Sequence, residues 1–228
     1  MRLTTPRHLV MPAAASGLLM AGHLLLRPYG DAPSSTSPEA AAAFASPWWV
    51  VAHLAGALAL VQLARVGLRI DDLLSTSTTM IARWSGLAGV ALSLPYYGAE
   101  TFGLHAIGRA GVDDPAVLGL VDEVRNHPSA LTTFGVGLLL LAVSGLATAT
   151  AWRGAVRSER WATPAWAAWP LAVGALLLLP QFFLPPAGRT AFGVAWAAAA
   201  LILAVAAHRA DQSPTMTLPR ATTFLSGA

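Results

Sequence analysis

The sequence contains no cysteine and no lysine, and it has few charged residues of any kind. Without cysteine, the chain has no disulfide, thiolate metal site, iron–sulfur cluster or cysteine nucleophile. Without lysine, it has no amine that could form a Schiff base with a carbonyl compound. Charged residues make up 11% of the chain, against about 25% in soluble globular domains. Since hydrophobic residues make up 55%, this composition excludes soluble and disordered classes and predicts a membrane protein.

Six segments are long and apolar enough for transmembrane helices, which need about 20 residues each. They cover approximately residues 9–26, 48–66, 81–105, 131–152, 165–184 and 190–207. Short helices outside the membrane are predicted near residues 38–46 and 115–126, because Ser37 and Asp114 each precede a proline, a common helix start. We therefore predict an all-α polytopic integral membrane protein in which residues 1–228 form one six-helix bundle. Kinks or breaks are expected at Pro95, Pro170 and Pro180.

The arginines predict how this bundle is oriented. With both termini on one side, that side holds Arg2, Arg7, Arg65, Arg69, Arg83, Arg153, Arg157, Arg160, Arg209 and Arg220. The other side keeps Arg27, Arg109, Arg125 and Arg189. Cytoplasmic loops are enriched in positive charge, so we predict a multi-pass protein of the cytoplasmic membrane with both termini cytoplasmic. The arginines are scattered between apolar segments, which argues against nucleic-acid binding.

Polar side chains within the predicted spans gather near the outer side. Hydrocarbon penalises each buried polar group, so such residues mark candidate functional sites. Because successive helices run in opposite directions, residues from several spans reach a similar depth. This layer consists of His23, His53, Glu100, His105, His127 and Gln181.

Glu100 is the only carboxylate within a predicted span, and this predicts acid–base chemistry. A carboxyl group held away from water can stay protonated and act as a general acid. Tyr96 and Tyr97 lie one helical turn before it, and aromatic faces stabilise carbocations. This type of site resembles that of membrane-bound terpenoid cyclases. The resemblance implies cyclisation or isomerisation of a lipophilic, isoprenoid-like substrate, taken from the lipid bilayer and handled without a cofactor.

In this interpretation, Glu100 donates the proton, while His105, His53 and His23 tune, relay or accept protons. The substrate pocket is lined by Tyr96, Tyr97, Trp49, Phe102 and Gln181.

Three alternatives stay open at this point. His23 and His53 lie at matching depth on neighbouring antiparallel spans, which also suits a redox protein that binds haem b or, with His105, a divalent metal. A small-molecule transporter is compatible with the topology, although the inner halves of the spans carry few polar groups. Finally, neighbouring helices alone could satisfy each polar side chain, in which case the layer is purely structural.

Overall fold

The computed structural model describes residues 5–212, so Arg2 and Arg220 of the orientation argument lie outside the described residues. Within this range the chain forms helices and no strand, which confirms the all-α prediction. Six helices pack as a closed ring in which each contacts the next and the last returns to the first. In ring order they are α1 (Val10–Leu26), α3 (Pro47–Leu74), α4 (Ser77–Gly98), α7 (Pro128–Arg157), α8 (Trp169–Leu176) and α9 (Pro186–Gln212).

Four helical segments in the described part of the chain are long and apolar enough to cross a membrane. They are Pro6–Leu26, which joins the 3₁₀ helix η1 (Pro6–Leu9) to α1, together with α3, α7 and α9. The 30 residues of α7 extend about 45 Å at 1.5 Å per residue, well beyond a hydrocarbon core of about 30 Å. The structure thus supports a multi-pass membrane protein with parts that project beyond the bilayer.

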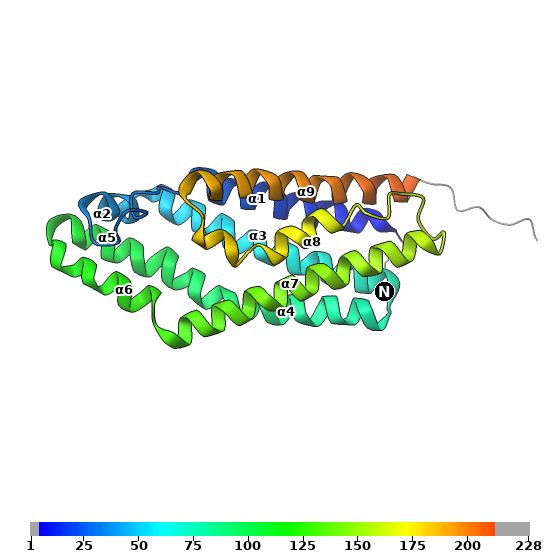
Figure 1. The fold of residues 1–228 in the computed structure, drawn as a ribbon, viewed down its shortest axis with the longest axis horizontal. Helices are drawn as coiled ribbons and strands as arrows, with labels where there is room; N and C mark the ends of the chain where they lie inside the picture. Colours follow the sequence, from blue (N-terminus) through cyan, green and yellow to red (C-terminus); the bar gives the residue numbers. More distant parts are fainter. Residues whose placement is uncertain (1–4, 213–228) are drawn as a thin grey trace, which may run out of the picture.

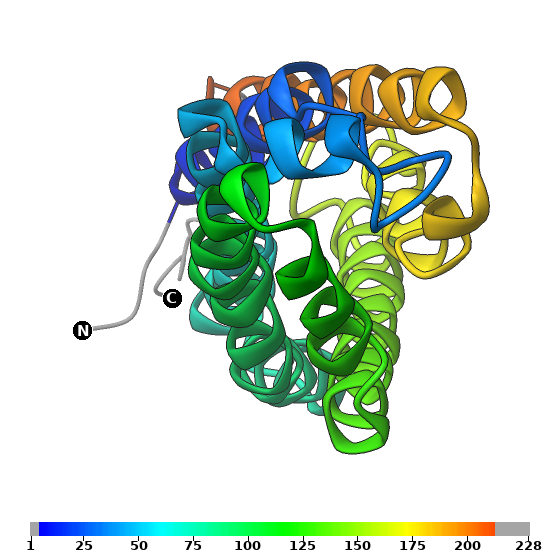
Figure 2. The same ribbon diagram turned by 90° about the vertical axis from the view of Figure 1, so that its left-hand side faces the viewer.

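The bundle is elongated, and its two ends differ (Figure 1). The start of α1 and the end of α9 lie together at one end. The opposite end carries a cap of short helices, α2 (Pro38–Ala45), α5 (Leu104–Asp113), the 3₁₀ helix η3 (Pro115–Gly119) and α6 (Leu120–Arg125). Figure 2 looks onto this cap. Helical segments are present at both predicted positions, the second as η3 followed by α6, and Ser37 and Asp114 each accept a capping hydrogen bond from the backbone.

The predicted fifth span, residues 165–184, is not a continuous helix. Only α8 and the 3₁₀ helix η4 (Pro180–Phe183) are regular, and turn residues separate them. Pro170 lies in the first turn of α8 and Pro180 begins η4. Proline is tolerated at a helix start but removes a hydrogen bond in a helix interior. The expected breaks at these prolines are therefore present, and they leave only eight residues of α-helix.

The predicted third span, residues 81–105, is also not one regular α-helix. After α4, the turn η2 (Ala99–Gly103) is a π-helix, and α5 then continues the chain into the cap. Pro95 lies within α4, one turn before η2. A π-turn accommodates an extra residue in a helix and is frequent at functional sites. Glu100 lies in this turn and is buried.

Two separate apolar clusters stabilise the molecule. The main cluster runs along the bundle interior, where small residues let the helices approach closely. At Gly67, for example, an added Cβ would lie 2.7 Å from the carbonyl oxygen of Ala82. The smaller cluster holds the cap on the bundle and is centred on Phe44, Trp49, Leu104 and Leu118.

Candidate functional site

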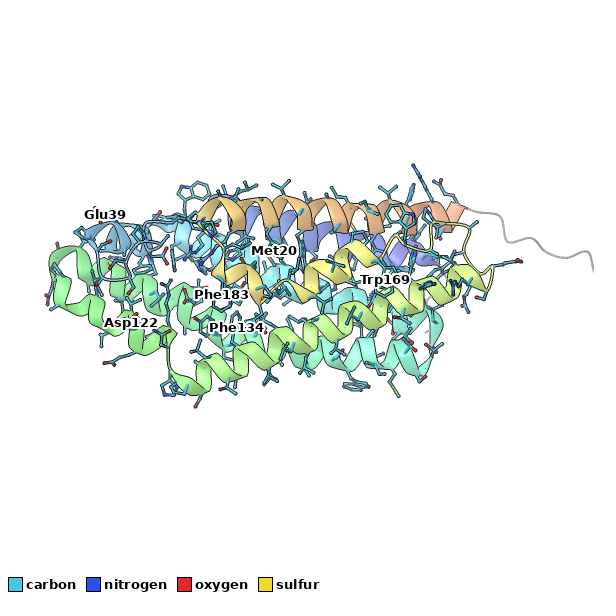
Figure 3. All side chains as sticks on the ribbon, viewed as in Figure 1. Met20, Glu39, Asp122, Phe134, Trp169 and Phe183 are labelled. Carbon is cyan, nitrogen blue, oxygen red and sulfur yellow. The ribbon has the colours of Figure 1, made fainter. Side chains whose placement is uncertain are left out.

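A cavity of about 380 Å³ lies beneath the cap, at the end of the bundle opposite the start of α1 and the end of α9. Its size falls in the range typical of small-molecule sites. In Figure 3, Phe134 of the cavity wall lies between Asp122 in the cap and Trp169 toward the other end. The polar lining residues are His23, Arg27, Asp31, His53, Tyr96, Tyr97, Glu100, Arg125, Asn126, Gln181 and Arg189, and the apolar ones include Leu24, Phe134 and Phe182.

A charge network crosses the cavity wall and joins the cap to the bundle. Arg125 of α6 donates from Nε to Glu100 Oε1 at 2.8 Å and from Nη2 to Glu100 Oε2 at 3.1 Å. Its Nη2 is also 2.9 Å from Asp31 Oδ2. The same Asp31 oxygen accepts from Arg27 Nη2 at 2.7 Å. These four side chains are only 5–18% exposed, so water screens their interactions weakly.

Aromatic rings and opposite charges hold both arginines of this network in place. The Arg27 guanidinium lies over the rings of Tyr29 and Trp49, and that of Arg125 lies over Phe44 and Trp49. Burial by itself would lower the pKa of Arg125, but the Glu100 and Asp31 carboxylates raise it above its usual value. The bidentate pair engages both oxygens of Glu100, so neither is free to contact a ligand unless this pair opens.

The hydrogen bonding of His53 assigns its protons. Its Nδ1 lies 2.7 Å from the backbone oxygen of Trp49, and because a carbonyl oxygen only accepts, Nδ1 must carry the hydrogen. In the neutral ring this leaves an unprotonated Nε2, which lies 3.8 Å from Glu100 Oε2. That separation is too long for a hydrogen bond. If Nε2 takes up a proton, the resulting imidazolium faces a carboxylate.

His23 lies beside His53 and has the same tautomer. Its Nδ1 donates across to α3, to the backbone oxygen of Ala52 at 2.9 Å, so its Nε2 is also unprotonated in the neutral ring. The two imidazole rings meet edge to face, with centroids 5.2 Å apart. Bis-imidazole haem ligation instead requires a porphyrin between the two rings, so this geometry does not favour haem.

The π-turn explains how Glu100 reaches the cavity. It is five residues long and displaces the helix from regular α-helical phase. The indole Nε1 of Trp49 donates to the backbone oxygen of Glu100 at 2.7 Å. Trp49 in turn lies one turn before His53 on α3, and its ring is 4.2 Å from the His53 ring. Trp49 thus helps to position both the backbone at Glu100 and the ring of His53.

With this geometry established, the chain was compared with known proteins. No protein-family model, curated protein or solved structure matches it. The chemistry of the cavity therefore carries the functional inference without support from a relative.

The structure brings most of the predicted site residues together. His23, His53, Tyr96, Tyr97, Glu100 and Gln181 all line the cavity, and Trp49 packs directly behind it. Two predicted residues are elsewhere. His105 bonds through Nδ1 to the backbone oxygen of Phe44 at 2.8 Å, and Phe102 points outward with 59% of its surface exposed.

The metal alternative required His23, His53 and His105 to converge, and the position of His105 does not allow this. Among residues 5–212, no group of three or more His, Cys, Asp or Glu side chains is arranged to hold a metal ion. The histidines of the cavity therefore act as a pair, next to the single carboxylate of Glu100.

Sequence reasoning missed the cationic residues of the cavity. Arg27, Arg125 and Arg189 line it together with Asp31. One signal was present: these are three of the four arginines assigned to the arginine-poor side of the bundle. An arginine that departs from the positive-inside pattern has no topological reason to be there, and it is therefore a candidate for a functional role.

Proposed function

We propose that this protein is an integral-membrane enzyme that moves a proton on a lipophilic substrate, in the manner of an isomerase. His53 is the base that removes the proton, and Glu100 is the carboxylate that stabilises protonated His53. The observation that carries this proposal is the geometry of His53, whose Nδ1 lies 2.7 Å from the Trp49 carbonyl oxygen while its Nε2 lies at the cavity, 3.8 Å from Glu100 Oε2. Histidine is the most frequent general base in enzymes, and here the carboxylate faces the nitrogen that would take up the proton.

The pairing of Glu100 favours proton removal over proton donation as the first step. A cyclisation that begins with protonation of an alkene needs a neutral carboxylic acid. Arg125 contacts both oxygens of Glu100, so such an acid would have to leave its partner first. Within the expected range of cyclase and isomerase chemistry, the site therefore supports isomerisation.

The proposed reaction balances without an oxidant, a reductant or a cofactor. His53 Nε2 takes a proton from a carbon that an adjacent carbonyl group makes acidic. The C–H electron pair moves toward that carbonyl, and the double bond shifts. The same proton, or one from water, then returns to a different carbon from His53 Nε2, which regenerates the neutral imidazole. Tyr96 and Tyr97 provide aromatic walls for the substrate.

Hydrogen exchange tests this proposal without knowledge of the substrate. Purified protein in lipid nanodiscs is incubated with a total membrane-lipid extract in D₂O, and the lipids are analysed by mass spectrometry. We expect at least one lipid species to gain deuterium at carbon or to convert to an isomer. The His53→Gln variant should lose this reaction, because a glutamine amide is not a base at neutral pH.

The matched control is His208→Gln, which makes the same change in an exposed histidine at the opposite end of the bundle. It should leave exchange unchanged. The proposal fails if wild-type protein labels nothing beyond empty nanodiscs, or if His53→Gln labels as well as His208→Gln.

We further propose that all six ring helices lie in the cytoplasmic membrane and that both chain termini are cytoplasmic, which puts the cavity near the outer face. The arginine distribution supports this orientation. Because the chain has no cysteine, single cysteines can report it. Ser34→Cys in the cap loop should react with an impermeant maleimide in intact cells, whereas Ser158→Cys should react only after lysis. The reverse labelling pattern would show that the protein has the opposite orientation.

A further inference from the structure

The charges around the cavity do not balance. Three arginines line it, Arg27, Arg125 and Arg189, against two carboxylates, Asp31 and Glu100. With neutral histidines this leaves one positive charge in excess. A charge without a partner is unfavourable beside a cavity in a membrane protein even where its side chain is only half-buried, so the excess charge favours an anionic ligand.

The excess is located at Arg189. Arg27 and Arg125 each form an ion pair with a carboxylate. Within residues 5–212, Arg189 forms none and donates to two backbone oxygens, from Nη2 to Phe182 and from Nε to Leu184. These bonds hold the guanidinium at the cavity and use neither hydrogen of Nη1. Arg189 is therefore positioned but not neutralised.

Three further polar atoms of cavity-lining residues lack partners, and one of them, Asp31 Oδ1, is an acceptor that needs a donor hydrogen on the ligand. The side chain of Gln181, a residue only 4% exposed, makes no hydrogen bond through Oε1. Arg27 Nη1 is buried and has no acceptor. Buried polar atoms are normally hydrogen-bonded. An amide can present either its oxygen or its NH₂ group after a flip, so Gln181 and the two arginines together suit a ligand group rich in acceptor oxygens.

The remaining wall is apolar. Phe134 and Phe182 meet edge to face, with ring centroids 5.5 Å apart, and both line the cavity. The next residue along the chain, Phe183, is 85% exposed, so this side of the cavity adjoins the outer, lipid-facing surface of the bundle. A polar pocket that opens beside an apolar wall fits a molecule with a charged head and a hydrocarbon tail.

We infer that the substrate is an amphiphile with an anionic head, a carboxylate or a phosphate monoester, which binds Arg189 with help from Arg27 and Gln181. Its tail lies along Phe134 and Phe182. This inference rests on the proposed function, because it assigns the substrate class of that site. The head anchors the molecule, and His53 then acts on a carbon of the same molecule.

Binding of matched probes tests the inference. Protein in nanodiscs of neutral phosphatidylcholine is titrated with dodecanoate, dodecyl phosphate or dodecanol, each expressed as a mole fraction of total lipid, and its thermal unfolding is followed. At least one anionic probe should stabilise the protein at a mole fraction about ten-fold lower than dodecanol, the ratio expected for one charge-assisted contact. Whichever of the two anions binds more tightly identifies the head group.

The variants locate the contact. Arg189→Gln should reduce the preference for anions to less than about three-fold, whereas Arg189→Lys keeps the charge and should keep most of it. Arg109→Gln, which removes an exposed arginine of α5 near the same end, should have no effect. Retention of the wild-type unfolding temperature without probe shows that each variant is folded. Equal binding of dodecanol, or an unchanged preference in Arg189→Gln, would overturn the inference.

His53→Gln separates the two proposals. It should bind the anionic probes like the wild type, because it leaves Arg189 intact. Anion preference without deuterium exchange in the wild type would remove the catalytic proposal alone. Exchange that depends on His53, without anion preference, would remove the substrate assignment alone.

Discussion

Two networks, each of two arginines and two acidic residues, lie at the two ends of the bundle. The capped end has Arg27, Arg125, Asp31 and Glu100; the other end has Arg69, Arg83, Asp71 and Asp72. The two networks have the same formal charge, but they differ in burial and in how far apart their residues lie in the sequence.

The network at the far end is local. Its residues lie on both sides of the turn between α3 and α4, where Ser75 adopts a left-handed backbone conformation. Its side chains are 15–35% exposed. Asp71 also accepts a hydrogen bond from Thr79 at 2.7 Å, which helps to close the turn. Such a network has an ordinary structural explanation.

The network at the capped end links residues from the loop after α1, the π-turn and α6, and it is buried beside a cavity. A local turn does not need it, and burying four charges is costly. Composition alone therefore does not distinguish a structural charge cluster from a candidate site. Burial, sequence separation and an adjacent cavity make that distinction.

The largest expected effect is at the cap. Arg125→Met leaves two buried carboxylates without this partner and should lower the free energy of unfolding by about 3–5 kcal/mol. The double variant Arg125→Met/Glu100→Gln removes both charges of the bidentate pair and should recover part of the loss. Denaturant unfolding in detergent measures both. If the double variant is no more stable than the single one, the pair is not coupled as its geometry requires.

An intermediate effect is expected from two glycines of α3. An added Cβ at Gly67 would lie 2.7 Å from the backbone oxygen of Ala82, and since backbone yields little, Gly67→Ala should cost about 1–3 kcal/mol. At Gly56 the Cβ would lie 2.9 Å from His23 Cγ and from Tyr97 Cε1. These side chains line the cavity, so Gly56→Ala should impair binding of the anionic probe more than stability.

The control for both is Gly135→Ala in α7, where an added Cβ has no atom within 4 Å. Because alanine favours a helix, this variant should be as stable as the wild type or more so. Thermal unfolding and probe titration compare the three variants. Equal stability of Gly67→Ala and Gly135→Ala would contradict the close approach of Gly67 to the Ala82 backbone.

The smallest effect is expected at the far end. Arg83 is 35% exposed and its contacts to Asp71 and Asp72 are both 3.4 Å long. Exposed ion pairs contribute about 0–1 kcal/mol, so Arg83→Gln should shift unfolding by less than that and leave probe binding unchanged. A loss of unfolding free energy comparable to that of Arg125→Met would show that the two networks contribute equally to stability.

Much of the architecture could be predicted from the sequence. Apolar runs are local, so they located the long helices, and the Ser37–Pro38 and Asp114–Pro115 pairs located the short ones. Hydropathy could not show how far α8 is shortened, because an apolar run has the same mean whether or not its backbone is helical. It also gave no sign that α3 would continue through Arg69 and Asp71 to Leu74.

The site was predictable only in part. Alternating chain direction correctly indicated that His23, His53 and Glu100 share a depth. Ion pairing between Arg125 and Asp31 was not predictable, because the two residues belong to different loops and helices that only the folded cap brings together. For the same reason the sequence presents Glu100 as an isolated acid, whereas the folded chain pairs both of its oxygens with Arg125.

The π-turn sets a rotational offset between bundle and cap. One residue of an α-helix corresponds to a rotation of about 100°, so deleting Gly103 would return η2 to regular pitch and swing α5 around its axis by roughly that angle. His105 would leave the carbonyl of Phe44, and α6 would carry Arg125 away from Glu100. A single surplus residue thus sets the angular register in which the whole cap meets the ring of helices.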